Sequence, residues 1–185
     1  MNTLKNDFFV FGDFVLEALN DETIVEGFDC GDLDLNEYFL SDSIAHRREM
    51  FTKSYCFHFC DDEIQNSLAL VDFCNAEIRR ESFNGIDGIN QIPSGKREYS
   101  FFPAVKITRL GVSRPFQKHH IGSALLDTIK MFFISCAKTG CRFLLVDAYR
   151  AALAFYLKND FASLYVKKPE NRRTLPLFFD LKSVS

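Results

Sequence analysis

Apolar and polar residues alternate along residues 104–126, and the period of the alternation changes within this segment. Val105 and Ile107 share one parity of an expected strand, whereas Leu110 and Val112 share the other. Because successive side chains of a strand point to opposite faces, the change of parity predicts a β-bulge between Ile107 and Leu110. The apolar residues that follow recur at helical spacing, at Ile121, Leu125, Ile129, Phe132, Phe133 and Cys136. The pattern therefore predicts a strand, a loop and a helix.

A polar loop joins this strand to this helix, and it contains Gln117, Lys118, His119, His120, Ile121, Gly122 and Ser123. The first N–H groups of a helix have no partner within the helix, and the helix dipole adds partial positive charge there. Such a loop binds anions, most often phosphate, and Gly122 lets a ligand approach the backbone closely. Lys118 and Arg114 add positive charge nearby. The alternative is an ordinary turn whose residues happen to be polar.

This strand, loop and helix resemble motif A of the GNAT superfamily, the acetyl-CoA-dependent N-acetyltransferases. The family pattern is a strand, then Gln/Arg-x-x-Gly-x-Gly/Ala, then an apolar helix. Gln117 and Gly122 match that pattern, and His120 stands where the family usually has its first glycine. The backbone N–H at that position is retained, so the resemblance predicts a pyrophosphate-binding loop.

Two further segments resemble the same superfamily. Phe28–Gly31 followed by Leu35–Leu40 is similar to the N-terminal signature of a GNAT branch that includes toxins acetylating aminoacyl-tRNA. An ordinary turn before a helix is the alternative for this segment. Val146–Phe161 resembles motif B, in which a strand precedes Ala-x-x-Phe-Tyr-x-x-x-Gly-Phe, with Asp160 in place of the glycine. The three segments occur in the family's order, so together they predict a GNAT-like fold.

Other periodic runs predict the rest of an α/β fold. Further strands are predicted at Phe14–Leu19, Lys53–Asp61, Ile64–Phe73, Cys141–Ala148, Phe161–Val166 and Leu175–Leu181. We expect a mixed, mostly antiparallel sheet of about seven strands, flanked by helices and splayed at the bulge, in a single N-acetyltransferase domain over residues 1–185. Residues 74–102 contain the turn residues Gly85, Gly88, Pro93 and Gly95, which predicts a long loop that either lines the acceptor site or is a surface excursion.

Two more helices follow from capping residues and apolar spacing. Asp32 or Asp34 can cap a helix that runs to about Met50. Its expected inner face is Leu35, Phe39 and Leu40. A second helix is predicted at Ala151–Lys158, and the following Asn159–Asp160 tolerates the left-handed conformation that ends helices.

Composition and charge narrow the class of protein. A chain of 185 residues is long enough to bury the core of one domain. The net charge of −3 gives no global electrostatic case for nucleic-acid binding. No apolar run approaches the roughly 20 residues of a membrane span, and the N-terminus lacks a basic-then-apolar signal pattern. We therefore expect a cytoplasmic protein with no membrane partner.

The chain has six cysteines and no Cys-x-x-Cys pair, so we expect reduced thiols. Cys56, His58 and Cys60 have a spacing that suggests metal ligands. In the expected strand, however, the two cysteines would lie roughly 13 Å apart at ~3.3 Å per residue. Ligands of one zinc ion lie about 2.3 Å from the metal, so we expect no metal site.

The GNAT resemblance implies a set of functional residues. Acetyl-CoA is the implied cosubstrate, and its pantetheine and thioester would contact the backbone of Leu110, Gly111 and Val112. Its pyrophosphate would bind the loop amides of Gln117, Lys118, His119, His120, Ile121, Gly122 and Ser123. Tyr156 stands at the position of the family's general acid, and its alternative role is that of an amphipathic packing residue. Many members use a glutamate of the bulged strand as base, and this strand has no carboxylate.

The acceptor is the least determined part of this prediction. An amine of a small molecule or peptide is the first expectation. A toxin-like enzyme that acetylates the α-amine of aminoacyl-tRNA is the second, and a non-catalytic acyl-CoA-binding module is the third. The dibasic pairs Arg47-Arg48, Arg79-Arg80, Lys167-Lys168 and Arg172-Arg173 would bind tRNA if they converge, and are otherwise solvated surface pairs. Both tRNA and a second copy of the chain, in a homodimer, stay open as partners.

Overall fold

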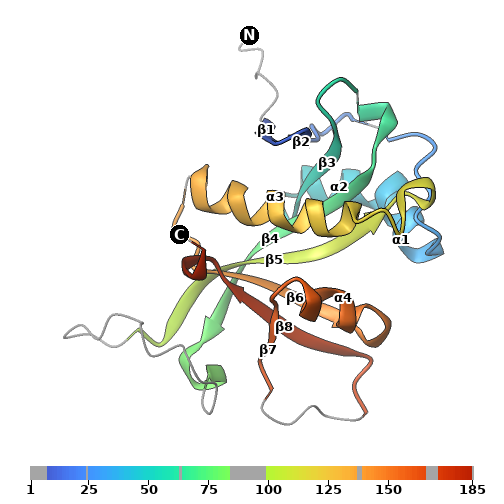
Figure 1. The fold of residues 1–185 in the computed structure, drawn as a ribbon. Coiled ribbons are helices and arrows are strands. Elements are labelled where there is room, and N and C mark those ends of the chain that lie inside the picture. The colour runs from blue at the N-terminus through green and yellow to red at the C-terminus, as the bar shows by residue number, and fades with distance from the viewer. Residues whose placement is uncertain are drawn as a thin grey trace. The chain divides into compact units, whose positions relative to one another are not determined.

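The computed structural model describes residues 8–23, 25–62, 64–83, 99–136, 139–165 and 171–184. The chain forms two compact units, each built from two stretches of sequence. The first unit takes Met1–Cys74 with Ile107–Ala137, and the second takes Asn75–Lys106 with Lys138–Ser185. Figure 1 follows the elements from the N-terminus in blue to the C-terminus in red.

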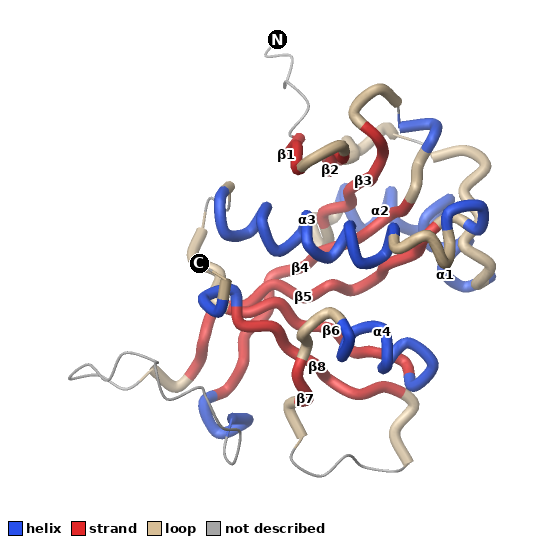
Figure 2. Tube along the Cα trace, viewed as in Figure 1, coloured by secondary structure: helices blue, strands red, loops and turns tan. Residues whose placement is uncertain are grey.

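The strands are hydrogen-bonded in the order β1-β2-β3-β4-β5-β6-β8-β7, which makes an eight-stranded sheet. The sheet is mostly antiparallel and includes a parallel pair, as expected for the fold, with one strand more than predicted. Figure 2 separates these strands, in red, from the helices, in blue. The strands are β1 Phe8–Phe11, β2 Phe14–Ala18, β3 Lys53–Phe59, β4 Ala69–Arg79, β5 Phe101–Val112, β6 Phe143–Tyr149, β7 Ala162–Ser163 and β8 Thr174–Asp180.

The additional strand is β1, which forms a hairpin with β2 in the first unit. Phe11 lies opposite Phe14, and a two-residue turn joins them. Gly12 takes a positive φ of 60° in this turn, a conformation that glycine adopts without a steric penalty. The hydrophobic pattern did not predict β1 because its four residues, FFVF, are all apolar and do not alternate with polar residues.

The predicted helix after residue 32 is present in three consecutive pieces. α1 spans Leu33–Glu37, a π-helical segment spans Tyr38–Asp42, and α2 spans Ser43–Arg48. The Asp32 side chain accepts a hydrogen bond from the Leu35 amide, which confirms the predicted N-cap.

The π-helical segment changes which residues face the core. Leu35 packs against the core and Phe39 is 3% exposed, as predicted. Leu40, also expected inside, is 38% exposed, and Tyr38 is buried instead. A π-helix has a longer repeat than an α-helix, so a face counted at α-helical spacing shifts by one position at this point.

The core of the first unit combines strand residues with aromatic rings from the helical segments. Its buried cluster consists of Leu19, Val25, Phe28, Tyr38, Phe39, Cys56 and Leu70. α3, Ile121–Ser135, follows the predicted helix closely, and its Leu125, Leu126 and Ile129 are fully buried. Burial of each such side chain stabilises the folded state by roughly 1.5–3 kcal/mol.

The strand β3 contains Cys56 and His58, and Cys60 follows it in a turn. Cys56 Sγ lies 3.1 Å from Ser67 Oγ, and His58 Nε2 lies 3.3 Å from Glu17 Oε2. Within the described residues, no group of three His, Cys, Asp or Glu side chains is arranged to hold a metal ion. In the same part of the chain, no helix is both long and apolar enough to cross a lipid bilayer.

The second unit corrects the predicted loop 74–102. β4 continues to Arg79, a 3₁₀ turn covers Arg80–Phe83, and β5 begins at Phe101, so both ends of that segment are ordered. Residues 84–98 lie outside the described part, and the role predicted for them stays a prediction. The ends are held because Phe83 is buried against Phe102, Phe143 and Phe178, with ring centroids 5.8, 5.1 and 5.3 Å away.

The remaining elements of the second unit are close to their predicted positions. β8 pairs antiparallel with β6 on one side and with β7 on the other. A 3₁₀ turn at Arg150–Ala152 leads into α4, Leu153–Lys158. Asp160 then takes a positive φ of 67°, which confirms the predicted left-handed helix end. β7 is shorter than the predicted strand Phe161–Val166.

Candidate functional site

The predicted strand, loop and helix are present in the predicted order, and the end of the strand, the loop and the helix belong to the first unit. β5 ends at Val112, a 3₁₀ turn covers Arg114–Phe116, and α3 begins at Ile121. Ile121, Gly122 and Ser123 therefore belong to the first turn of α3 rather than to the loop. The burial pattern of β5 changes phase earlier than expected, because the consecutive Ala104 and Val105 are both buried. The bulge between Ile107 and Leu110 stays a prediction.

The backbone amides at the start of α3 are open. The first hydrogen bond of the helix runs from the Ala124 amide to the His120 carbonyl oxygen, at 3.0 Å. The amides of residues 118–123 donate no hydrogen bond to any described residue. His120 makes no side-chain cap, and the first turn of α3 contains no acidic residue. The positive end of this 15-residue helix is therefore free to bind an anion.

Two residues of the loop have left-handed backbone conformations. Lys118 has a φ of 66° and His120 a φ of 62°. The conformation of His120 is one that glycine adopts freely, which accounts for the glycine that motif A usually has at this position. Histidine is among the residues enriched in this region, so the loop keeps its shape with a side chain present.

The side chain of Gln117 forms two hydrogen bonds at the start of the loop. Its Nε2 donates hydrogen bonds to the carbonyl oxygens of Cys30, at 2.7 Å, and Val112, at 2.9 Å. Its backbone N–H donates to the Arg114 carbonyl oxygen at 3.3 Å. Gln117 therefore holds the entry to the loop, and its predicted amide contact with pyrophosphate stays a prediction.

The charged residues expected near the loop differ in their surroundings. Arg114 Nε forms an ion pair with Asp29 Oδ2 at 3.2 Å, so its positive charge is balanced. Lys118 and His119 are exposed and make no hydrogen bond or ion pair with a described residue. Lys118 is therefore the side chain that adds charge beside the open amides.

The end of β5 packs tightly against an earlier turn of the chain. Gly111 is buried, and a Cβ placed on it would lie 3.2 Å from Cys30 Cβ, Cys30 Sγ and Phe28 Cζ. A side chain at this position would force its neighbours apart, so glycine permits the close approach. Leu110 and Val112, on either side, are half-buried.

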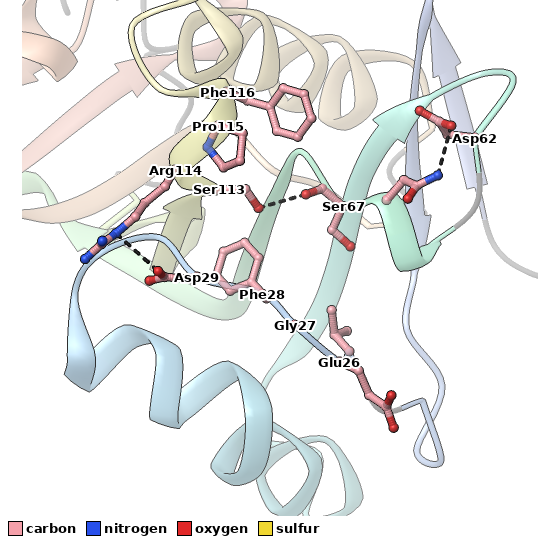
Figure 3. Close-up of a pocket in the computed structure, with 12 residues that line it drawn as sticks. Glu26, Gly27, Phe28, Asp29, Asp62, Ser67, Ser113, Arg114, Pro115 and Phe116 are labelled. Atoms are coloured by element: carbon pink, nitrogen blue, oxygen red, sulfur yellow. Dashed lines mark hydrogen bonds and ion pairs between the residues drawn. The ribbon is translucent and has the colours of Figure 1, made fainter.

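A pocket of about 460 Å³ lies in the first unit beside this region. Its lining is Val25, Glu26, Gly27, Phe28, Asp29, Asp62, Asn66, Ser67, Ser113, Arg114, Pro115 and Phe116. Figure 3 shows Arg114 directed toward Asp29 across one side of it. With Arg114 balanced, Glu26 and Asp62 leave the lining acidic, which disfavours the phosphates of a nucleotide cofactor. None of the predicted cofactor residues lines this pocket.

Tyr156 lies in α4, in the second unit. Its side chain is buried, with its ring 5.0 Å from that of Phe155 and 5.4 Å from that of Phe161, centroid to centroid. Among the described residues its hydroxyl has no hydrogen-bond partner. Burial raises the pKa of the Tyr156 phenol, so the group keeps its proton at neutral pH.

Lys106 and Arg109 of β5, and Asp72 of β4, each contact another side chain. Lys106 Nζ lies 2.5 Å from Asp147 Oδ2. The Arg109 guanidinium stacks over the Tyr38 ring, 4.9 Å from its centroid. Asp72 is fully buried, and its Oδ2 accepts a hydrogen bond from the Tyr38 hydroxyl. These positions assign no general base.

The residues of the basic pairs differ in their surroundings. Arg47 is buried and donates to the carbonyl oxygens of Asn20 and Thr23, so it has a structural role. Arg79 stacks over Phe101, with Cζ 5.8 Å from the ring centroid, in the second unit. Lys167 and Lys168 lie outside the described residues. Arg172 and Arg173 stack over Tyr165 and Tyr149, respectively.

The sequence matches no family model and no curated protein. Solved structures do match. AtaT complexed with acetyl-methionyl-tRNAfMet is 23% identical, covers 93% of this chain and 97% of that chain, and has a TM-score of 0.70. A tyrosine-to-phenylalanine mutant of KacT is 22% identical over 93% of this chain and 97% of that chain, with a TM-score of 0.72. AtaTR bound with AcCoA is 22% identical over 92% and 95%, with a TM-score of 0.67. The chain therefore has a GNAT-like fold, which it shares with AtaT and KacT.

Proposed function

We propose that this chain is an N-acetyltransferase that transfers the acetyl group of acetyl-CoA to an amine. The observation that carries the proposal is the row of open amides at residues 118–123, at the N-terminus of α3. Phosphate groups, including those of a pyrophosphate, are typical ligands of such a row. One similar structure, AtaTR, is bound with AcCoA, and this supports the same cosubstrate here.

The cosubstrate would lie along the end of β5. Backbone groups of Leu110, Gly111 and Val112 would bind the pantetheine arm, and the amides from Gln117 to Ser123 would hold the pyrophosphate. A backbone N–H near Leu110 would donate to the thioester oxygen as negative charge develops on it. Each of these interactions is made by the main chain, so it tolerates the departure from the family's glycine at His120.

The transfer is a direct attack of the amine on the thioester. The neutral amine nitrogen forms a bond to the carbonyl carbon, which gives a tetrahedral intermediate, and the C–S bond then breaks. The leaving sulfur takes a proton from the Tyr156 hydroxyl, and the amine loses one proton to water. That proton returns to the tyrosinate through solvent, so the products are the acetylated amine and CoA with a free thiol.

Tyr156 suits the role of acid because it is protonated and its ring is fixed. Packing against Phe155 and Phe161 holds the ring, whereas the hydroxyl has no hydrogen-bond partner in the described part of the chain. Because its pKa is raised, the phenol stays protonated until the leaving sulfur takes the proton.

A small-molecule or peptide amine is the first acceptor we propose, and aminoacyl-tRNA is the second. A surface of the second unit favours tRNA, because Arg172 and Arg173 interleave there with Tyr165 and Tyr149. The Arg172 and Arg173 Cζ atoms lie 5.2 and 5.1 Å from the respective ring centroids, and Arg150 Nε donates to the Arg172 carbonyl oxygen. Arginines among aromatic rings are typical of surfaces that bind single-stranded nucleic acid. AtaT, which shares the fold, has been captured with acetyl-methionyl-tRNAfMet.

The function is tested by thiol release from acetyl-CoA with a panel of amines, basic peptides and charged tRNAs. Release that depends on one acceptor class supports the enzyme and identifies its substrate. Acetyl-CoA binding with no release for any acceptor would instead indicate a non-catalytic acyl-CoA-binding module. Growth arrest on expression would favour the tRNA acceptor, and harmless overexpression would count against it.

A further inference from the structure

The side chain of Asn36, in α1, forms hydrogen bonds that hold the turn at Phe28–Gly31 against α1. Asn36 Nδ2 donates to Asp29 Oδ1 at 2.7 Å, and Asn36 Oδ1 accepts from the Cys30 amide at 2.8 Å and from Cys30 Sγ at 3.1 Å. Asp29 Oδ1 also accepts from the Gly31 amide at 2.8 Å. Both ends of the Asn36 amide group are therefore used to fix the turn.

The same turn holds the segment that leads into the open amides. The Arg114 amide donates to the Asp29 carbonyl oxygen at 2.8 Å, and Arg114 Nε pairs with Asp29 Oδ2 at 3.2 Å. Gln117 Nε2 donates to the Cys30 carbonyl oxygen at 2.7 Å. Two successive residues of the turn thus hold the two ends of residues 114–117.

Residues 118–120 have no comparable support of their own. They make no hydrogen bond through their amides to described residues, and two of them hold left-handed conformations. Their position is set by α3 on one side and by Arg114 and Gln117 on the other. Amides fixed in advance bind an anion more tightly than amides that must be ordered on binding.

We propose that Asn36 is a positioning residue for acetyl-CoA: through Asp29 and Cys30 it fixes the turn that holds Arg114 and Gln117, and so pre-organises the pyrophosphate loop. The inference rests on the proposed function. It means that the geometry of the loop depends on Asn36, a residue that is distant from the loop in the sequence. On this account, the turn at Phe28–Gly31 and the pyrophosphate loop act together in binding acetyl-CoA.

The charge of Asp29 supports its interactions with Asn36 and Arg114. The hydrogen bond from Asn36, followed by that from the Gly31 amide, lowers the pKa of the Asp29 carboxyl below 3.8. Asp29 is therefore ionised across the physiological range and remains an acceptor for Asn36 and a partner for Arg114.

The test compares Asn36→Asp with a matched control, Asn66→Asp. Both substitutions remove an amide donor to a carboxylate in the first unit, because Asn66 Nδ2 donates to Asp62 Oδ1 at 3.1 Å. We expect Asn36→Asp to weaken acetyl-CoA binding about tenfold, raising KM with kcat unchanged, since hydrogen bonds that pre-order the loop are lost. Asn66→Asp should bind as the wild type does. Unchanged binding by Asn36→Asp, or equal weakening in both variants, would overturn the inference.

A second measurement needs neither cosubstrate nor activity. Hydrogen exchange of the ligand-free protein should accelerate at the hydrogen-bonded amides of Arg114, Phe116 and Gln117 in Asn36→Asp and remain unchanged in β3. Gln117→Leu, which leaves the turn intact but removes its bond to Cys30, should do the same and covers the case in which Asn36→Asp does not fold. Unchanged exchange in both variants would refute the positioning role. If the wild type does not bind acetyl-CoA, the proposed function fails, and exchange still decides whether Asn36 orders the loop.

Discussion

The Tyr38 hydroxyl donates a hydrogen bond of 2.5 Å to Asp72 Oδ2 in the interior of the first unit. Asp72 is fully buried, and its Oδ1 has no hydrogen-bond partner in the described part of the chain. Burial and the hydrogen bond to Asp72 raise the pKa of the Tyr38 phenol, so Tyr38 remains the donor. The carboxyl group of Asp72 therefore depends on Tyr38 for the side-chain hydrogen bond that it has.

Replacing Tyr38 with phenylalanine should destabilise the protein. The ring and its packing are kept, whereas Asp72 Oδ2 loses its donor inside the core. An unsatisfied buried acceptor of this kind lowers the free energy of unfolding by about 1–3 kcal/mol. Urea unfolding measures the change as a lower midpoint at constant slope.

The exposed Tyr149 provides a control for the same substitution. Tyr149→Phe keeps the ring under Arg173 and should change the free energy of unfolding by no more than about 0.5 kcal/mol. If Tyr38→Phe were as stable as the wild type, the buried hydrogen bond would not support the fold.

Glycine at position 120 should be accepted without loss. His120 holds a left-handed conformation, which disfavours residues with a Cβ by roughly 1–2 kcal/mol, and glycine relieves that strain. The greater freedom of glycine in the unfolded chain offsets about half of the gain. We expect His120→Gly to match or exceed wild-type stability and to retain acetyl-CoA binding, as measured by thermal unfolding and titration.

His119→Gly is the matched comparison one position earlier. His119 has no positive φ, so glycine brings only the entropic penalty there and should lower stability by about 0.5–1 kcal/mol. Loss of acetyl-CoA binding in His120→Gly would show that the geometry assigned to this loop is wrong.

The cysteines should divide by reactivity. Burial raises the pKa of Cys56 to about 12 and that of Cys141 to about 11, so both thiols stay protonated at pH 8. Cys60 and Cys136 are exposed. Iodoacetamide followed by peptide mass spectrometry should label Cys60 and Cys136 in the folded protein and all cysteines in urea. Fast labelling of Cys56 without denaturant would contradict its buried position.

The same pKa values predict a direction for stability at alkaline pH. In the unfolded chain the thiols ionise near 9.0, whereas the folded protein keeps them protonated to higher pH. Stability from these groups is complete below pH 9.0 and decreases as pH rises toward the folded values.

Tyr156→Phe should separate binding from chemistry. Without the hydroxyl, the leaving thiolate has no acid, so we expect the transfer rate to fall roughly 10²–10⁴-fold with acetyl-CoA affinity unchanged. Stability should change little, because the hydroxyl has no hydrogen-bond partner among the described residues. Stopped-flow measurement of thiol release gives the rate, and an undiminished rate would remove Tyr156 from the mechanism.

Local signals in the sequence predicted the elements that local rules control. Asp32 at the helix start, Asp160 at a helix end and the apolar spacing of α3 each depend on near neighbours, and each is confirmed. The exposure of Leu40 could not be predicted from the apolar spacing. That spacing was counted at the α-helical period, which does not reveal a π-helical segment. The part of β4 after Phe73 was not predicted. Its polar residues Asn75 and Glu77 obscured the apolar signal of Ile78, which is buried.

The supports of the candidate site were less visible from the sequence than the site itself. The open amides follow from a polar loop before an apolar helix with a glycine in its first turn. The bonds from Gln117 to Cys30 and from Asn36 to Asp29 join side chains to partners that periodicity cannot specify. The resemblance at Phe28–Gly31 was the one signal that could have pointed to this turn, and its packing against Gly111 gives that signal a physical cause.

The central claim is that the open amides of residues 118–123 bind the pyrophosphate of acetyl-CoA. Calorimetric titration of the wild-type protein with acetyl-CoA tests it most directly, with desulfo-CoA and adenosine as comparisons. We predict that acetyl-CoA and desulfo-CoA both bind, because both carry the pyrophosphate, and that adenosine does not. A folded protein that binds neither CoA compound would contradict the account.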